Sequence, residues 1–195
     1  MSELNGNGMI GEVSQASTTR FRAIASKVFE PPRFGSFVKV ASTGGLIYGV
    51  VASVETASFD SARRAMAFGM PWEQLLREQP QLMELIQTEF DTVVIGYGEG
   101  DTLHHFLPPY PPRLHDFVST CTPTEVAAIT DSMEFVRTLA GARDGSVHEL
   151  VSAAIREASI ARGRDETFVS EAARAVAELF KDDYDLAMSI VRRLE

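Results

Sequence analysis

The feature that most constrains the fold is a nine-residue, mostly apolar run at residues 46–54, directly after the pair Gly44-Gly45. Glycine adopts positive φ without steric cost, so a Gly-Gly pair suits the tight turn of a hairpin. The run itself is rich in β-branched and aromatic residues, as expected of a strand. Gly49 inside it predicts a bulge or a sharp bend in a barrel.

Extended patterns of the same kind occur on both sides of this hairpin. Residues 20–24 alternate polar and apolar side chains with a period of two, which predicts a half-buried strand. The other segments with a strand pattern are residues 9–13, 37–40, 92–97 and 117–118. We therefore expect a small closed antiparallel β-barrel over residues 9–120, preceded by a disordered terminus at residues 1–8.

A proline-guided corner occurs twice in the chain. Residues 31–38 read PPRFGSFV and residues 111–118 read PPRLHDFV. Proline fixes φ and removes a hydrogen-bond donor, so each copy predicts a rigid turn that delivers a Phe-Val pair into a strand. Two such turns are consistent with two related corners of one barrel.

A helical insertion is predicted at about residues 60–90. Residues 61–68 fit two helical turns, and Pro80 divides residues 72–90 into two short helices. The insertion holds Trp72, the only tryptophan of the chain, together with Met66, Met70 and Met83. Methionine and tryptophan are enriched at binding surfaces, so these four residues are our candidate interaction surface. The alternative is that they pack on the barrel or on the C-terminal helices.

From Thr122 onward the pattern is helical, and we expect a C-terminal all-helical domain over residues 122–195. Thr122 and Glu125 have the spacing of a capping box, with Pro123 at the first helical position. One helix should run from there to Gly141, a second should start after a cap at Ser146, and two more should follow. The fold class is therefore α+β.

The formal net charge is −9, which opposes the attraction between Lys or Arg and phosphate backbones. We expect no direct nucleic-acid binding. A local basic edge at Arg20, Arg22 and Lys27 is interpreted as a solvated strand face, with contact to a phosphate as the alternative.

Three further observations bear on the cellular compartment in which we expect this chain. Cys121 is the only cysteine, so an internal disulfide is excluded. No apolar run reaches the roughly 18–20 residues of a membrane span. The first eight residues lack the basic start and apolar core of a secretory signal. We expect a cytoplasmic protein without membrane association.

Residue patterns for catalysis are missing. A phosphate-binding P-loop needs a lysine and a hydroxyl after its glycines, and none of Lys27, Lys39 and Lys181 has that setting. The glycines between Gly96 and Gly100 do not have the spacing of a dinucleotide fingerprint and predict a hairpin turn. We expect no catalytic residues, no metal and no cofactor, and an enzyme is the less favoured interpretation.

The alternative from another functional class is a small-molecule-binding protein or enzyme. It would use the loop between Gly96 and His105 together with His115 and Cys121. Cys121 lies one residue before a predicted helix start, where a thiol pKa can fall, but no partner base is identifiable. This hypothesis requires the residues to converge in one pocket.

The first 120 residues resemble the HAS-barrel, the N-terminal β-barrel of HerA-type DNA-translocating ATPases, which is similar to the N-terminal barrel of rotary ATP synthase catalytic subunits. The segments that carry the resemblance are residues 10–13, 34–40, 45–51, 94–97, 111–112 and 117–118. In that family the barrel precedes a RecA-like ATPase core, whereas here about 75 residues with a helical pattern follow and no P-loop is found.

The resemblance implies a barrel without its motor, and ATP hydrolysis is not carried over. In the motor proteins the barrel looks like a surface for assembly and docking. We therefore expect a non-enzymatic interaction module that forms homo-oligomers or is accessory to a ring-forming DNA-translocating ATPase. The sequence assigns no individual residues to that role.

Overall fold

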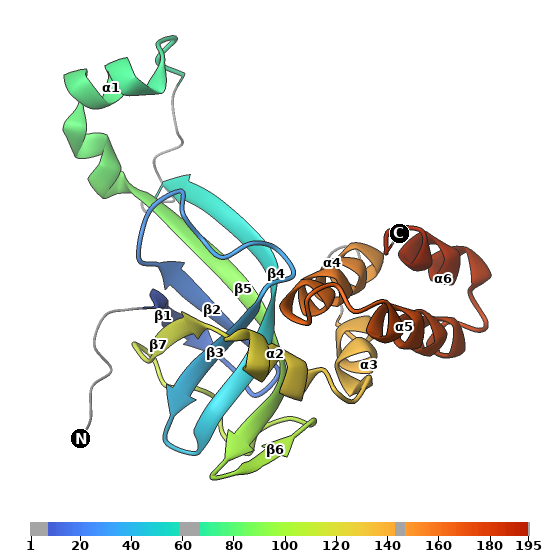
Figure 1. Cartoon of the computed structure of the whole chain (residues 1–195). Helices are drawn as coiled ribbons and strands as arrows, with labels where there is room; N and C mark the ends of the chain where they lie inside the picture. Colours follow the sequence, from blue (N-terminus) through green and yellow to red (C-terminus); the bar gives the residue numbers. More distant parts are fainter. Residues whose placement is uncertain (1–7, 59–66, 143–146, 195) are drawn as a thin grey trace.

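Seven strands form one antiparallel sheet that closes on itself in the computed structural model, which describes residues 8–58, 67–142 and 147–194 (Figure 1). The strand order is β2-β1-β7-β3-β4-β5-β6, and a further pairing of β2 with β5 closes the first six strands into a barrel. The strands are β1 (Met9–Ala16), β2 (Arg20–Ala25), β3 (Phe37–Ser42), β4 (Gly45–Ser58), β5 (Ile86–Glu99), β6 (Thr102–His104) and β7 (Phe117–Thr120). The predicted closed barrel is confirmed.

All six barrel strands contribute side chains to a buried core, among them Phe21 of β2, Val38 of β3 and Phe90 of β5. The opposite faces of β3, β4 and β5 are buried as well, under the C-terminal helices. A strand buried on both faces has no reason to alternate polar and apolar residues. This explains the nearly continuous apolar run around Gly49. The pairing of β4 with β5 does shift register between Tyr48 and Gly49, but the extra residue is Ile95, so the bulge lies on β5 opposite Gly49.

The two proline-guided corners have the same geometry. Gly35 and His115 occupy equivalent positions and both have positive φ, +83° and +68°. The next residue makes the same backbone hydrogen bond in both copies. Ser36 N donates to Arg33 O in the first, and Asp116 N donates to Arg113 O in the second. The corners lead into β3 and β7, which pair antiparallel. In the order β2-β1-β7-β3-β4-β5, the strands β7 and β3 that follow the two corners are therefore the central pair.

Strands β4 and β5 continue beyond the pairing with β2 as a two-stranded ribbon, paired from Thr56–Thr88 to Ser58–Ile86. The ribbon ends in α1 (Trp72–Glu78) and the 3-10 helix η1 (Pro80–Leu85), at the upper left of Figure 1. We call the ribbon with α1 and η1 the arm.

The sequence prediction for this region is partly wrong. Pro80 does divide two short helices, but residues 86–90 belong to β5 rather than to the second helix. Their pairing with β4, and from Glu89 onward also with β2, outweighs the helical spacing of the leucines. The two helical turns predicted at residues 61–68 lie mostly outside the described residues.

The C-terminal part consists of α2 (Pro123–Ile129), α3 (Glu134–Ala140), α4 (Val147–Ala161), α5 (Glu166–Leu179) and α6 (Tyr184–Val191). The capping box is confirmed, because Thr122 Oγ1 accepts from Glu125 N and the Glu125 carboxylate accepts from Thr122 N. The predicted cap at Ser146 lies outside the described residues.

The single helix predicted from Thr122 to Gly141 is wrong: it is broken between α2 and α3. Arg162, which follows α4, donates to Thr130 Oγ1 and to the carbonyl of Ala127 in the last turn of α2. These bonds satisfy groups that the next helical turn would otherwise use, so the chain can turn there.

These helices cover the outer wall of the barrel formed by β3, β4 and β5. Phe37 of β3 meets Phe135 of α3 edge to face, with ring centroids 6.2 Å apart. One buried apolar cluster therefore joins the barrel wall to the helices. Among the described residues, no helix combines the length and the apolar character that crossing a membrane requires.

Candidate functional site

The arm places three of the four candidate interaction residues at one end of the molecule. Trp72 begins α1, Met70 lies just before it, and Met83 lies in η1. Met66 lies outside the described residues. Trp72 is 39% exposed, whereas Met70 and Met83 are partly buried.

The tip of the arm, residues 67–85, has little core of its own. Leu75 is its one buried apolar side chain among the described residues. Phe68, Trp72 and Leu85 are large apolar side chains that stay exposed there. Since large apolar groups gathered on a projecting element commonly mark a contact site, the tip has the composition of a docking surface.

The tip contacts the rest of the chain through an aromatic pair. The rings of Phe29 and Trp72 meet edge to face with centroids 5.2 Å apart, and Phe29 itself is 50% exposed. Phe29 has positive φ, and its backbone N–H donates to Thr88 Oγ1 of β5 at 3.1 Å. Sequence analysis missed Phe29, because it lies 43 residues from Trp72 and only the fold brings it to the arm.

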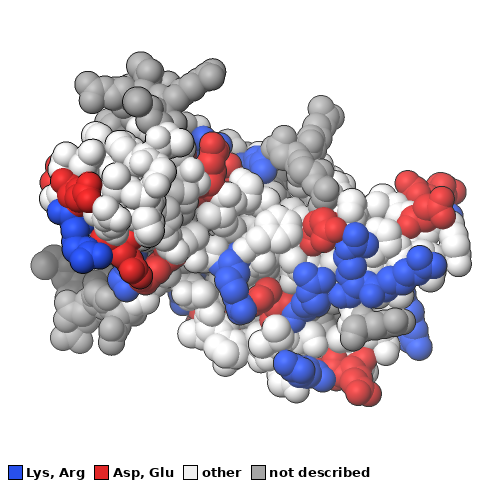
Figure 2. All heavy atoms as spheres, turned by 90° about the horizontal axis from the view of Figure 1, so that it is seen from above, with Lys and Arg blue, Asp and Glu red and all other residues white. Residues whose placement is uncertain are grey.

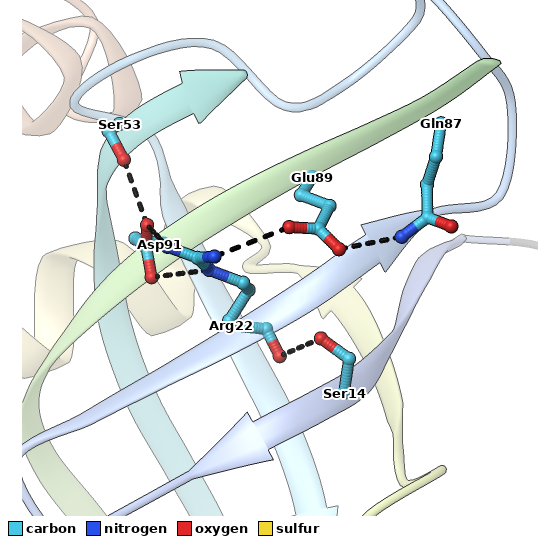
Figure 3. Close-up of polar contacts among 6 residues, drawn as sticks. All are labelled: Ser14, Arg22, Ser53, Gln87, Glu89 and Asp91. Atoms are coloured by element: carbon cyan, nitrogen blue, oxygen red, sulfur yellow. Dashed lines mark hydrogen bonds and ion pairs between the residues drawn. The ribbon is translucent and has the colours of Figure 1, made fainter. Parts of the chain in front are cut away.

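A polar network on the barrel exterior ties the base of the arm to β2 (Figure 3). The Arg22 guanidinium donates to both carboxylate oxygens of Asp91, at 3.1 and 2.8 Å, and to Glu89 at 3.4 Å. Ser53 Oγ of β4 donates to Asp91 at 3.1 Å, so the network spans three strands. Figure 3 shows the Arg22 side chain reaching across to the two carboxylates.

The pKa values in this network follow from the ion pair. Hydrogen bonding to Asp91, together with its charge, raises the pKa of Arg22. Burial alone would raise the pKa of Asp91, but the hydrogen bonds and the charge of Arg22 outweigh it and hold that pKa below its ordinary value. The predicted basic edge is thus partly neutralised, since Lys27 also pairs with Glu30, at 2.9 Å.

Charge is distributed unevenly between the arm and the helices. The described residues of the arm carry three acidic side chains, Glu73, Glu78 and Glu84, against one basic side chain, Arg77. Residues 121–195 are net acidic as well, with nine Lys or Arg against fourteen Asp or Glu, so it is the placement of charge rather than its sum that differs. Figure 2 shows Lys and Arg side chains gathered in a band over the helical half of the molecule. In that half Arg156 donates to the carbonyl of Arg193, and Arg193 pairs with Glu149.

The residues of the small-molecule hypothesis lie at separate places. His105 lines a groove beside α3, whereas Cys121 lines another beside the first proline-guided corner. The His115 side chain is 85% exposed and faces Glu12 at 3.4 Å. Gly96 is buried within β5, and the glycines after it form the predicted hairpin between β5 and β6.

Chemistry at Cys121 is further disfavoured. Burial raises the pKa of the Cys121 thiol to about 12, and the negative charge of Glu125 adds to the shift. A thiol with such a pKa is a poor nucleophile at neutral pH. Within residues 8–58, 67–142 and 147–194, no three His, Cys, Asp or Glu side chains are grouped so that they could hold a metal ion.

The comparisons with known proteins give no family assignment: no protein-family model matches this sequence, and no curated protein matches it either. Small antiparallel barrels occur in many unrelated families, so the fold by itself does not assign one.

Proposed function

We propose that this chain is a non-enzymatic interaction and assembly module. The observation that carries the proposal is the arm: a ribbon that extends beyond the barrel and ends in exposed Phe68, Trp72 and Leu85. The network of Arg22 with Asp91 and Glu89 holds the base of the ribbon, so the tip is presented in a defined direction. A preorganised apolar element loses little conformational entropy when it docks.

The partner we propose first is a second copy of this chain. The acidic flank of the arm is complementary in charge to the band of Lys and Arg side chains that Figure 2 shows over the helical half. Complementary potentials guide encounter and fix orientation, while buried apolar groups at the centre supply most of the affinity. The arm of one copy would accordingly pack against the helices of another.

The resemblance to HAS-barrels supports the same class of function. It adds a second proposed partner, a ring-forming DNA-translocating ATPase to which this chain would be accessory. The role proposed is docking, because the sequence holds no P-loop lysine with which to hydrolyse ATP itself.

Size-exclusion chromatography with light scattering tests self-association. The wild-type mass should rise toward that of a dimer as concentration increases, and Trp72→Ser should hold the chain closer to the monomer. Tyr110→Ser is the matched control, since Tyr110 is an exposed aromatic residue of the proline-rich segment outside the arm. A wild type that stays monomeric at every concentration would remove self-association from the proposal.

The charge argument is tested separately. Glu73→Lys combined with Glu78→Lys reverses two charges of α1 and should weaken the dimer about fivefold or more. Glu99→Lys combined with Asp101→Lys makes the same net change in the exposed β5–β6 hairpin, outside both the arm and the helices, and should leave the dimer affinity unchanged. Equal weakening by both pairs would show that only net charge matters and would contradict the proposed orientation.

A further inference from the structure

A groove with a volume of about 620 Å³ lies where the barrel wall meets α3. Val93 and Ile95 of β5 line one side, Arg137 and Thr138 of α3 line another, and the segment after β6 contributes His105. Cavities that bind small organic molecules commonly measure about 300–1,000 Å³ and often lie between packed units. The groove has the size and the place of such a site.

The charge of this groove differs from that of the whole chain. Arg20, His105 and Arg137 line it, and none of the Asp or Glu residues that the structure describes does, although the chain carries a net charge of −9. Arg20 also lines the neighbouring groove, where its charge acts on Asp91, so Arg137 is the main cation available to a ligand. Glu134 faces Arg137 at 3.5 Å, but both side chains are more than half exposed, and such pairs are weak.

A polar atom in the wall of the groove has no partner. Nδ1 of His105 is buried and makes no hydrogen bond to any described residue. Buried polar atoms nearly always have a hydrogen-bond partner, and an exception calls for a water molecule or a ligand to supply one. Because this atom is enclosed rather than open to the groove, the guanidinium of Arg137 is the polar group that the groove offers to an anion.

The rest of the groove is apolar and partly open to solvent. Phe106 and Leu107 line it and are 60% and 43% exposed, which is unusual for two large neighbouring apolar side chains. The apolar group of a ligand could cover Phe106 and Leu107 while its charged group reaches Arg137.

We propose that this groove binds a small organic anion, a carboxylate or phosphate ester attached to an apolar group. The anion pairs with Arg137, and the apolar group covers Phe106 and Leu107. The site is separate from the arm, so this proposal can be tested independently of the proposed self-association.

Three probes with the same apolar ring test the proposal: 1-naphthoate, neutral 1-naphthalenemethanol and cationic 1-naphthylmethylammonium. Each is titrated into the full ¹⁵N-labelled chain and followed by amide chemical shifts. Naphthoate should shift the amides of Val93, His105 and Arg137 at millimolar or lower concentration. The neutral probe should bind about tenfold more weakly, and the cation should bind more weakly still.

The variant Arg137→Gln should weaken naphthoate binding about fivefold or more, whereas Arg174→Gln, the same change at an exposed position of α5, should not. Leu107→Ser should weaken all three probes together and tests the apolar part independently. Equal affinities for the three probes, shifts outside the groove, or unchanged naphthoate binding by Arg137→Gln would each overturn the proposal.

Discussion

Single side chains determine how firmly the arm is held to the barrel. The Arg22 guanidinium of β2 lies within 3.4 Å of the carboxylates of both Glu89 and Asp91 on the neighbouring strand β5. Their side chains are only about a quarter to a third exposed, so water screens these ion pairs less than it screens pairs on the open surface.

The variant Asp91→Asn should lower the free energy of unfolding by about 1–2 kcal/mol at pH 7, because Arg22 loses its ionic partner. A carboxyl group whose pKa is lowered by folding stabilises the folded state above its unfolded pKa, and this stabilisation is lost as the pH falls through the folded-state pKa. The difference between wild type and variant should therefore shrink below about pH 4.

Urea unfolding at several pH values measures this difference. Glu99→Gln, at the exposed far end of β5, is the control and should show almost no difference at pH 7. A difference for Asp91→Asn that stays constant from pH 7 to pH 2.5 would show that the carboxylate is not the stabilising group.

Cys121 offers a second test at the scale of the residue. With its pKa raised to about 12 by burial and by Glu125, the thiol should react very slowly with a disulfide reagent such as DTNB at pH 8. Denaturation in guanidinium chloride should restore rapid reaction with one thiol per chain. Rapid labelling of the native protein would revive the hypothesis of a reactive cysteine.

The candidate residues that sequence analysis found and missed differ in a physical way. Trp72, Met70 and Met83 were identifiable because composition alone marks adaptable apolar residues within one local segment. Phe29 and the Arg22–Asp91 pair were not, because they depend on which strands become neighbours. Pairing of β2 with β5 joins positions about 70 residues apart and has no local sequence pattern.

At the scale of the element, the two proline-guided corners provide a matched pair. A Cβ at Gly35 would lie 2.5 Å from the Cβ of Ala153 in α4 and would also have to adopt positive φ. Gly35→Ala should therefore cost about 2–4 kcal/mol. At the equivalent position His115 already has positive φ and an exposed side chain, so His115→Ala should change stability by less than about 0.5 kcal/mol.

Thermal or urea unfolding of both variants checks this pair. A similar small cost for the two substitutions would contradict the packing of the first corner against α4. His115→Ala exchanges one residue with a Cβ for another and serves as the control, whereas the cost of Gly35→Ala combines the strain of positive φ with the close contact to Ala153.

Local interactions explain which elements could be predicted. The capping box at Thr122 depends on residues three apart, so it was readable from the sequence. Gly49 marked the place of the register shift, but not that the extra residue is in β5. The break between α2 and α3 depends on Arg162, which lies 32 residues beyond Thr130. The start of β5 at Ile86 likewise depends on its pairing with β4.

At the scale of the whole molecule, the closed barrel was predictable because two similar corners and a hairpin indicate a sheet that turns back on itself. The placement of the helices on the wall of β3, β4 and β5 was not. The long apolar run showed that these strands are buried, but not which element buries their second face. The direction of the arm was equally beyond the sequence, since it follows from how far β4 and β5 stay paired.

The central claim is that the tip of the arm docks on another copy of the chain, and Trp72 reports on it directly because it is the only tryptophan. The measurement is tryptophan emission and its quenching by acrylamide, from low to high protein concentration. Docking of the exposed indole predicts a shift of the emission maximum to shorter wavelength and weaker quenching as concentration rises. Emission and quenching that stay the same while light scattering shows a dimer would place the interface elsewhere and contradict the claim.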